Sequence, residues 1–328
     1  MTGAVRAEVV SARGLAKRFA APWGSRSGGI AAVDGVDLAV VRGETLGLVG
    51  ESGSGKSTLG RMLLRLLEPD RGDIVFEGRP LTGLPNRQLR RLRPRMQIVF
   101  QNPYSALNPR MRVQEIIAFN LRAARVSRSD RRERVAEVLR LVSLERGILG
   151  RYPHQLSGGQ AQRVGIARAL VSAPAFLVAD EPVSALDLSV QAEILNLFGD
   201  LQESLELACL FISHNLQVVR HVAHRVAVMY AGRIVELGRR EAIYEEPQHP
   251  YTRLLLSAIP TGARSTDVLA ARAHRQRLRD ELRALPKDAP LREVFPGHFV
   301  ALQPAQGSLG DRDGAAPFAG NVGGRHGG

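Results

Sequence analysis

The chain has 328 residues, 44% of them hydrophobic and 5% aromatic, and carries a formal net charge of +13 at pH 7. A chain of this length can bury one large core or two modest ones. It contains no apolar run near the roughly 18 residues that a membrane-spanning helix needs, and its N-terminus lacks the apolar core of a signal peptide. We therefore expect a cytosolic protein, or one held at a membrane only through partners.

The positive charge does not by itself indicate a nucleic-acid partner. Of the 45 basic residues, all but Lys17, Lys56 and Lys287 are arginines, a ratio typical of the codon bias of a GC-rich genome. The sequence has no basic stripe interleaved with aromatic residues, which stacking on bases would require. We expect no nucleic-acid partner, and a positive face lying against anionic lipid stays open.

The N-terminal part of the chain predicts strands, then a loop, then a helix. Residues 8–49 read as short strands separated by a turn-rich loop at 20–29, and 45–49 is an apolar run typical of a buried strand. Apolar residues then recur with helical spacing from 57 to 67, where Pro69 closes the pattern. A glycine-rich segment lies between this strand and this helix, which is the setting that a phosphate-binding loop needs.

The rest of the chain alternates between predicted strands and helices. Further strands are expected at 96–100, 176–179, 210–213, 225–230 and 233–237, with the last two forming a hairpin. Helices are expected in the arginine-rich region 112–156, from there to 170, at 188–205 and at 267–285. This alternation predicts an α/β fold with a largely parallel sheet covered on both faces.

The same pattern suggests how the chain is divided. We expect one main domain over 1–260, with an inserted helical subdomain at about 102–170, then an extension over 261–302. Residues 303–328 are rich in glycine, alanine and charge without periodicity, so we expect a disordered tail. The single cysteine, Cys209, lies in an apolar stretch and is expected to be a buried small hydrophobe.

Residues 50–58, here called the phosphate loop, predict nucleotide binding. They read Gly50, Glu51, Ser52, Gly53, Ser54, Gly55, Lys56, Ser57 and Thr58. The glycines let successive backbone N–H groups point at the phosphates, and the following helix directs its positive end there. Lys56 supplies a mobile positive charge and the Ser57 hydroxyl a ligand for Mg²⁺. A chance glycine turn is the alternative, and the flanking strand and helix argue against it.

Four further residues follow three predicted strands at the same edge of the sheet. Asp180 is placed to hold Mg²⁺ through water, and Glu181 to polarise the attacking water of a phosphoryl transfer. Taken alone, the Asp-Glu-Pro sequence is also good chemistry for the start of a helix. Gln101 is expected to touch Mg²⁺ and the water, and His214 the γ-phosphate, although a lone residue of either type is usually structural.

Residues 156–160, Leu-Ser-Gly-Gly-Gln, form a second phosphate-binding face and are here called the signature segment. With the phosphate loop, Asp180-Glu181 and His214, it makes residues 8–260 resemble the ATPases of ABC (ATP-binding cassette) proteins. The resemblance implies a P-loop fold with an antiparallel β subdomain, a helical subdomain and a C-terminal extension. It implies ATP and Mg²⁺ as cofactors and two sites per head-to-tail dimer, because the signature segment covers the nucleotide of a partner subunit.

The resemblance also assigns roles. Glu181 is the general base, His214 the switch histidine and Gln101 the glutamine-loop residue, and these act with Lys56 as the catalytic set. Phe19 stacks on adenine. Mg²⁺ is held by Ser57, Gln101 and Asp180, Asp187 crosses the dimer interface, and Ser157, Gly158, Gly159 and Gln160 contact the partner's nucleotide.

Three segments narrow the resemblance. Residues 101–110, 244–252 and 290–300 are similar to the long glutamine loop, the post-cassette motif and the C-terminal end of oligopeptide and dipeptide importer ATPases. This implies a second ABC ATPase subunit, two integral membrane permease subunits and, indirectly, an extracytoplasmic solute-binding protein. It also implies a peripheral location on the cytoplasmic face of the cell membrane.

The sequence departs from its relatives at a few positions. Ala161 and Asn215 stand where a basic residue and an aspartate are common, and little loss of activity is expected from either. Residues 261–328 contain no cysteine, so we expect no iron–sulfur cluster. Two alternatives stay open: import of another solute, such as nickel or glutathione, and a non-transport ABC ATPase acting on nucleic acid or ribosomes. The second normally carries a long coiled coil or two cassettes.

Overall fold

The computed structural model describes residues 7–20, 29–259, 268–286 and 288–302. Most of the loop predicted at 20–29 and the whole tail predicted at 303–328 lie outside these residues.

Four strands form a small antiparallel sheet in the order β2-β1-β4-β5. These strands are β1 (Glu8–Phe19), β2 (Ile30–Val41), β4 (Arg71–Phe76) and β5 (Arg79–Pro80). Residues 8–49 therefore form two long strands, β1 and β2, followed by the short β3, and not several short strands. β1 and β2 pair from Glu8 opposite Val41 to Phe19 opposite Ile30. The antiparallel N-terminal sheet was predicted, whereas β4 and β5 were not.

A second sheet has eight strands in the order β11-β12-β10-β9-β3-β8-β7-β6. Its strands are β3 (Thr45–Val49), β6 (Met96–Val99), β7 (Phe176–Asp180), β8 (Ala208–Ser213), β9 (Arg225–Tyr230), β10 (Arg233–Arg239), β11 (Leu291–Phe295) and β12 (His298–Ala301). The five strands from β9 to β6 pair in parallel, and β9 and β10 form the predicted hairpin. The predicted largely parallel sheet is thus confirmed.

Alternate residues of the central strands enter two different cores, so both faces of the sheet are covered. In β7, Phe176 and Val178 pack into the core shared with the antiparallel sheet. Leu177 and Ala179 pack into the core shared with the helices of residues 103–170, here called the helical block. All four are fully buried. Cys209 is also buried, as expected.

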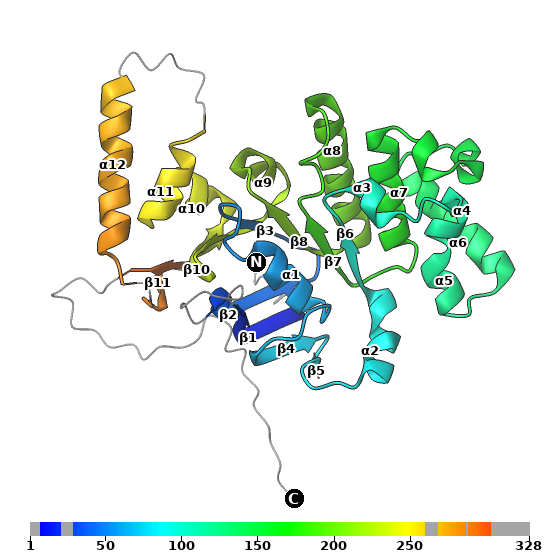
Figure 1. Cartoon of the computed structure of the whole chain (residues 1–328), viewed down its shortest axis with the longest axis horizontal. Helices are drawn as coiled ribbons and strands as arrows, with labels where there is room; N and C mark the ends of the chain where they lie inside the picture. Colours follow the sequence, from blue (N-terminus) through cyan, green and yellow to red (C-terminus); the bar gives the residue numbers. More distant parts are fainter. Residues whose placement is uncertain (1–6, 21–28, 260–267, 287, 303–328) are drawn as a thin grey trace, which may run out of the picture.

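Helices surround this sheet on both flanks (Figure 1). They are α1 (Lys56–Leu63), α2 (Asn86–Leu92), α3 (Pro103–Ala106), α4 (Val113–Ile117), α5 (Phe119–Ala123), α6 (Arg128–Leu141), α7 (Gly158–Leu170), α8 (Leu188–Leu205), α9 (Leu216–Val222), α10 (Arg240–Glu245), α11 (Pro250–Leu256) and α12 (Val268–Ala284). Helices α3 to α7 gather beyond β6, while α10 to α12 lie at the opposite end of the molecule. The bounds of α8 coincide with the predicted 188–205.

Helix α1 is shorter than predicted. It ends at Leu63 and does not reach residue 67, because Arg65 adopts a left-handed backbone with φ 51°. The Arg93 side chain donates to the carbonyls of Leu64 and Arg65. These contacts satisfy carbonyls that a helix end leaves without partners.

The C-terminal extension contains strands that the sequence pattern did not predict. β11 and β12 form a hairpin, and β12 pairs with β10, so the extension completes one edge of the large sheet. Four of the five residues of β11 are exposed, which removes the alternation that marks a half-buried strand.

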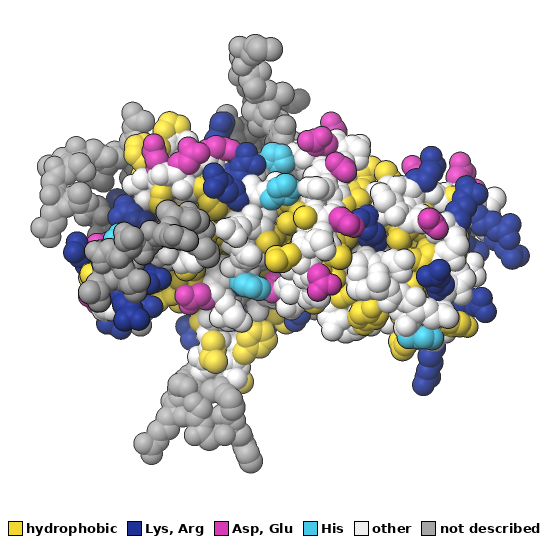
Figure 2. Space-filling model, turned by 90° about the horizontal axis from the view of Figure 1, so that it is seen from above, with side chains coloured by type: hydrophobic (Ala, Val, Ile, Leu, Met, Phe, Trp, Pro, Cys, Tyr) yellow, Lys and Arg dark blue, Asp and Glu magenta, His cyan; other side chains and the backbone are white. Residues whose placement is uncertain are grey.

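In the described part of the chain, no helix combines the length and the apolar character that crossing a bilayer requires. Basic side chains gather at the end of the molecule formed by the helical block, as Figure 2 shows from above. Arg128, Arg132 and Arg134 of α6 are exposed there.

Candidate nucleotide-binding site

The phosphate loop connects β3 to α1 and is fixed by close backbone packing. Gly55 caps α1 with φ 107°, and a Cβ atom there would overlap the carbonyl of Ala32 in β2. A Cβ at Gly50 would likewise overlap the carbonyl of Met229 in β9. Because only glycine fits at these two positions, the loop lies tightly between two strands of different sheets.

Lys56 points into this loop and is 4% exposed. Its Nζ donates to the carbonyls of Gly50 and Glu51, each at 2.8 Å, and lies 3.5 Å from the Ser54 hydroxyl. Burial lowers the pKa of the Lys56 ammonium, while the carboxylates of Glu181 and Asp180 oppose that shift. The positive charge is thus held by oxygen atoms of the loop itself.

Ser57, in the first turn of α1, meets Asp180 at the end of β7. The Ser57 hydroxyl donates to Asp180 Oδ1 over 2.7 Å. Asp180 is only 6% exposed, and burial raises the pKa of its carboxyl, against the opposing effect of the Ser57 hydrogen bond. A hydroxyl and a carboxylate side by side are the hard oxygen ligands that Mg²⁺ prefers.

Both carboxylate oxygens of Glu181 are held by neighbouring strand ends. Gln101, beyond β6, donates from Nε2 to Oε2 over 3.1 Å, and Nδ1 of His214, beyond β8, lies 3.1 Å from Oε1. Glu181 itself has φ 49°, and its N–H donates to the carbonyl of Ile212 over 3.0 Å. The left-handed backbone turns the chain after β7 and directs the carboxylate between the other two residues.

The signature segment opens α7 and lies apart from the phosphate loop. Ser157 Oγ accepts from the Gln160 N–H, and Gln160 Oε1 accepts from the Ser157 N–H, both at 3.2 Å, which is a reciprocal capping box. Within the described chain, no hydrogen bond joins these residues to 50–58. Gly159 packs against α8, because a Cβ there would lie 2.8 Å from the Val190 side chain, and Gly158 lies next to Leu186 just before α8.

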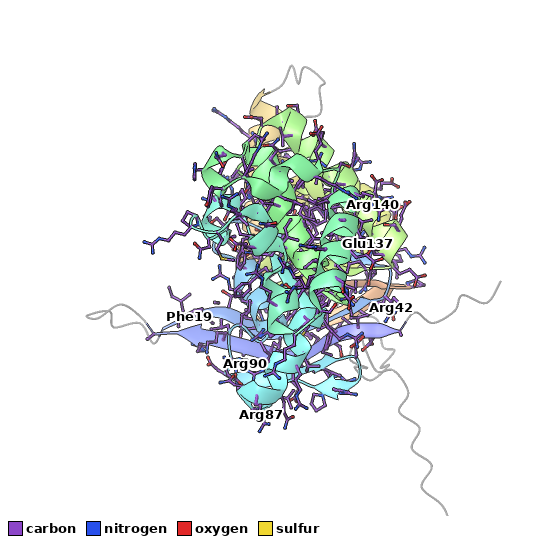
Figure 3. All side chains as sticks on the ribbon, turned by 90° about the vertical axis from the view of Figure 1, so that its right-hand side faces the viewer. Phe19, Arg42, Arg87, Arg90, Glu137 and Arg140 are labelled. Atoms are coloured by element: carbon purple, nitrogen blue, oxygen red, sulfur yellow. The ribbon has the colours of Figure 1, made fainter. Side chains whose placement is uncertain are left out.

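Phe19 and Asp187 are both exposed. Phe19 is 44% exposed at the end of β1, and Figure 3 shows it at the opposite end of the antiparallel sheet from Arg42. Its strand partner Ile30 is close in sequence to Ala32, whose carbonyl packs on the phosphate loop. Asp187 immediately precedes α8.

The two sequence departures have local explanations. Ala161 is fully buried in the core of the helical block, where it has no room for a long basic side chain. Asn215 caps α9, and its side chain accepts from the Gln217 N–H over 2.9 Å. Asparagine serves as a helix N-cap as well as aspartate does.

Two tyrosines join this region although sequence reasoning gave them no role. The Tyr104 hydroxyl donates to the Leu156 carbonyl over 2.9 Å, which links the segment after Gln101 to the signature segment. The Tyr251 hydroxyl accepts from the Glu51 N–H over 3.0 Å. Both tyrosines stand in segments whose similarity to importer ATPases was the available signal.

Two parts of the chain match models of known protein families. Residues 33–184 match the family model described as ABC transporter, and 235–286 match the one described as oligopeptide/dipeptide transporter, C-terminal region. The putative peptide import ATP-binding protein of Brucella ovis is 46% identical over 316 residues, which cover 89% of this chain and 96% of that protein. The oligopeptide transport ATP-binding protein AppF of Bacillus subtilis is 47% identical over 266 residues, covering 79% and 80%.

Solved structures of the same kind superimpose on the fold. The dimeric ATP-binding cassette MJ0796, in a post-hydrolysis state bound to ADP and phosphate, aligns with TM-score 0.63 and 29% identity over 70% of this chain and 98% of that one. The cbiO1 protein of Clostridium perfringens, part of the transporter complex cbiONQ, aligns with TM-score 0.65 and 28% identity over 73% and 91%.

Proposed function

This chain belongs to the ABC transporter family of ATPases, and we propose that it hydrolyses ATP to energise the import of oligopeptides or dipeptides through separate membrane subunits. The observation that carries the hydrolysis is Glu181, held between Gln101 and His214 beside the phosphate loop. The match of residues 235–286 to the C-terminal region of oligopeptide and dipeptide transporters supports the substrate class.

The site residues divide the chemistry between them. Residues 50–58 bind the phosphates of ATP through backbone N–H groups and the Lys56 ammonium, and Phe19 stacks on the adenine. Glu181 orients the attacking water and accepts its proton, while Gln101 and His214 keep the carboxylate in position. Because phosphoryl transfer depends mainly on positioning and charge stabilisation, this fixed arrangement supplies what the reaction needs.

Mg²⁺ would be held by Ser57 and Gln101 directly and by Asp180 through water. The pair of Ser57 Oγ and Asp180 Oδ1 at 2.7 Å fits such an ion in ligand type and in burial. The bound ion would neutralise phosphate charge that Lys56 alone does not balance.

We further propose that two such subunits act as a pair, as the dimeric MJ0796 cassette does. Residues 157–160 of one subunit would cover the nucleotide held by the other, and Asp187 would lie at their interface. The exposed positions of Ser157 and Asp187 support this arrangement. The partner is a second copy or a sister ATPase, and the pair would bind two membrane permease subunits that receive solute from an extracytoplasmic binding protein.

The proposed location is the cytoplasmic face of the cell membrane, where the permease subunits would hold the chain. The chain itself would be divided into an ATPase domain over 1–260, which includes the helical subdomain at 102–170, and an extension over 261–302. A carbonate wash, or loss of the permease subunits, should release the chain from membranes. Retention after both treatments would contradict this location.

One experiment distinguishes the solutes. The chain is reconstituted in vesicles with its permease subunits and any sister ATPase, and ATP hydrolysis is measured with the binding protein loaded with peptide, nickel or glutathione. We expect peptide to stimulate hydrolysis most. Stimulation by nickel or glutathione alone would mean that one of these, and not peptide, is the imported solute. If DNA or ribosomes, added in separate reactions, stimulated hydrolysis, the proposed transport function would be contradicted.

A further inference from the structure

A tyrosine from the C-terminal part of the chain touches the phosphate loop. Tyr251 lies in the first turn of α11, is 1% exposed, and accepts a hydrogen bond from the Glu51 N–H over 3.0 Å. The two residues are 200 positions apart in the sequence. The Tyr251 ring also packs on Tyr230 at the end of β9, with ring centroids 4.4 Å apart.

The hydrogen bond falls on one of the two peptide groups whose carbonyls accept from Lys56. The Glu51 N–H and the Gly50 carbonyl belong to the same planar unit and point in opposite directions, because the described peptide bonds are trans. The Gly50 carbonyl accepts from Lys56 Nζ over 2.8 Å. Tyr251 and Lys56 therefore hold opposite ends of one peptide, and rotating that peptide would break both contacts.

The segment just before Tyr251 is held by a buried carboxylate. Glu236 of β10 is 0% exposed and accepts from the N–H groups of Gln248, at 2.8 Å, and His249, at 3.1 Å. Nε2 of His298, in β12, lies 2.8 Å from the same carboxylate. His249 then accepts from the Tyr251 N–H through Nδ1 over 3.2 Å. The segment that carries Tyr251 is thus fastened to the large sheet and to the C-terminal hairpin.

The charge state of His249 fits its place in this chain of contacts. Burial, with Arg253 nearby, lowers the pKa of His249 to about 4. The ring is therefore neutral at pH 7, and Nδ1 can accept the Tyr251 N–H. Glu236, Tyr251 and Arg253 also contact this segment, and Arg253 Nε donates to the Pro247 carbonyl over 2.9 Å.

We propose that Tyr251 is a positioning residue of the ATP site: its phenol oxygen fixes the Gly50–Glu51 peptide and thereby the place of the Lys56 ammonium. The segment that carries Tyr251 thus holds the phosphate loop in place. This inference rests on the proposed binding of ATP by residues 50–58. The opposing view is that Tyr251 only fills space in the core.

Tyr251→Phe separates these views, because it removes the oxygen and keeps the ring and its packing on Tyr230. The matched control is Thr82→Val. It removes another hydroxyl that accepts a backbone N–H, that of Ile74 at 2.9 Å, in the turn after β5. The dissociation constant of MgATP is measured by calorimetry on the intact chain, together with the hydrogen exchange of residues 49–55. A lost hydrogen bond corresponds to an increase of about three- to tenfold.

We expect Tyr251→Phe to weaken MgATP binding by that factor and to accelerate exchange in 49–55, with Thr82→Val leaving both unchanged. In steady-state hydrolysis the KM for ATP should rise, and kcat should fall much less than in Lys56→Ala, because the ammonium is displaced and not removed. Unchanged binding in Tyr251→Phe, or an equal rise in both variants, would overturn the inference. A wild-type chain that does not bind MgATP would contradict the proposed function itself, and this inference with it.

Discussion

Glu181 and His214 face each other beyond the ends of β7 and β8, with Oε1 of the glutamate 3.1 Å from Nδ1 of the histidine. The other carboxylate oxygen accepts from Gln101. Three strand ends therefore fix the direction of one carboxylate whose side chain is only 16% exposed. A carboxylate held in this way needs no rearrangement before it accepts a proton.

Glu181→Gln should bind MgATP normally and lose hydrolysis by about a hundredfold or more, because an amide of the same shape cannot accept the proton of the water. Since the nucleotide then persists, the variant should elute from size exclusion as a dimer in MgATP. Glu203→Gln, the same change at an exposed position of α8, serves as the control. Elution as a monomer only would mean that Glu181 has another role or that a sister ATPase is needed.

Lys56→Ala should abolish ATP turnover, because the β- and γ-phosphates lose the charge that the loop carbonyls hold in place. Loss of one such stabilising group costs about a hundredfold or more in rate. Lys17→Ala is the matched control, since the Lys17 ammonium pairs with Asp70 at 2.6 Å outside the phosphate loop. Phosphate release at the wild-type rate in Lys56→Ala would refute the assignment of the loop.

Chelation of Mg²⁺ should stop hydrolysis, and Asp180→Asn should raise the Mg²⁺ concentration needed for half-maximal activity by about ten- to a hundredfold. The reason is that Asp180 would hold the ion through water, and its carboxylate accepts from the Ser57 hydroxyl. A titration of activity against Mg²⁺ measures the shift. Superimposable titrations of the variant and the wild type would remove Asp180 from the ion site.

Much of the site follows from the order of local patterns in the chain. The strand β3, the glycine loop and the start of α1 are consecutive, so their periodicity and glycines were sufficient to predict them. The strands β7 and β8 are short apolar runs, and parallel pairing brings Glu181 and His214 to one edge of the sheet. For these elements, local sequence and sheet geometry agree.

The rest depends on contacts between distant segments. At the end of α1, Arg65 is left-handed and its carbonyl accepts from the distant Arg93, and β12 is a strand through its pairing with β10. The hydrogen bond between Tyr251 and Glu51 joins residues 200 positions apart, so no pattern within a short stretch of sequence can predict it. The capping box that joins Ser157 and Gln160 also shows that both side chains stabilise the helix start, a role that the phosphate-binding interpretation had not included.

Stability should fall in mild acid because His249 is held neutral. Its pKa of about 4 in the folded chain lies below the 6.5 of an unperturbed histidine, so the unfolded chain binds more protons between these values. The contribution of His249 to the free energy of unfolding is fully present above pH 6.5 and is lost as the pH falls toward 4. Between pH 7 and pH 5 the free energy of unfolding should fall by about 2 kcal/mol.

Urea unfolding of the wild type and of His249→Asn at pH 7 and 5 measures this loss. Asparagine keeps an N-cap acceptor without titrating, so the variant should lose less stability than the wild type over this range. Equal losses in the two proteins would show that His249 does not carry the pH dependence.

If ATP hydrolysis at this site energises peptide import, the two processes must occur together in one transporter. The complete transporter is placed in vesicles with either the wild-type chain or Glu181→Gln. MgATP is supplied on the side of the membrane that carries the ATPase, and labelled peptide on the side of the binding protein. Phosphate release and peptide accumulation are followed together. We expect both in the wild type and neither in the variant. Peptide that accumulates to the same level in Glu181→Gln, or hydrolysis in the wild type without any peptide accumulation, would contradict the claim.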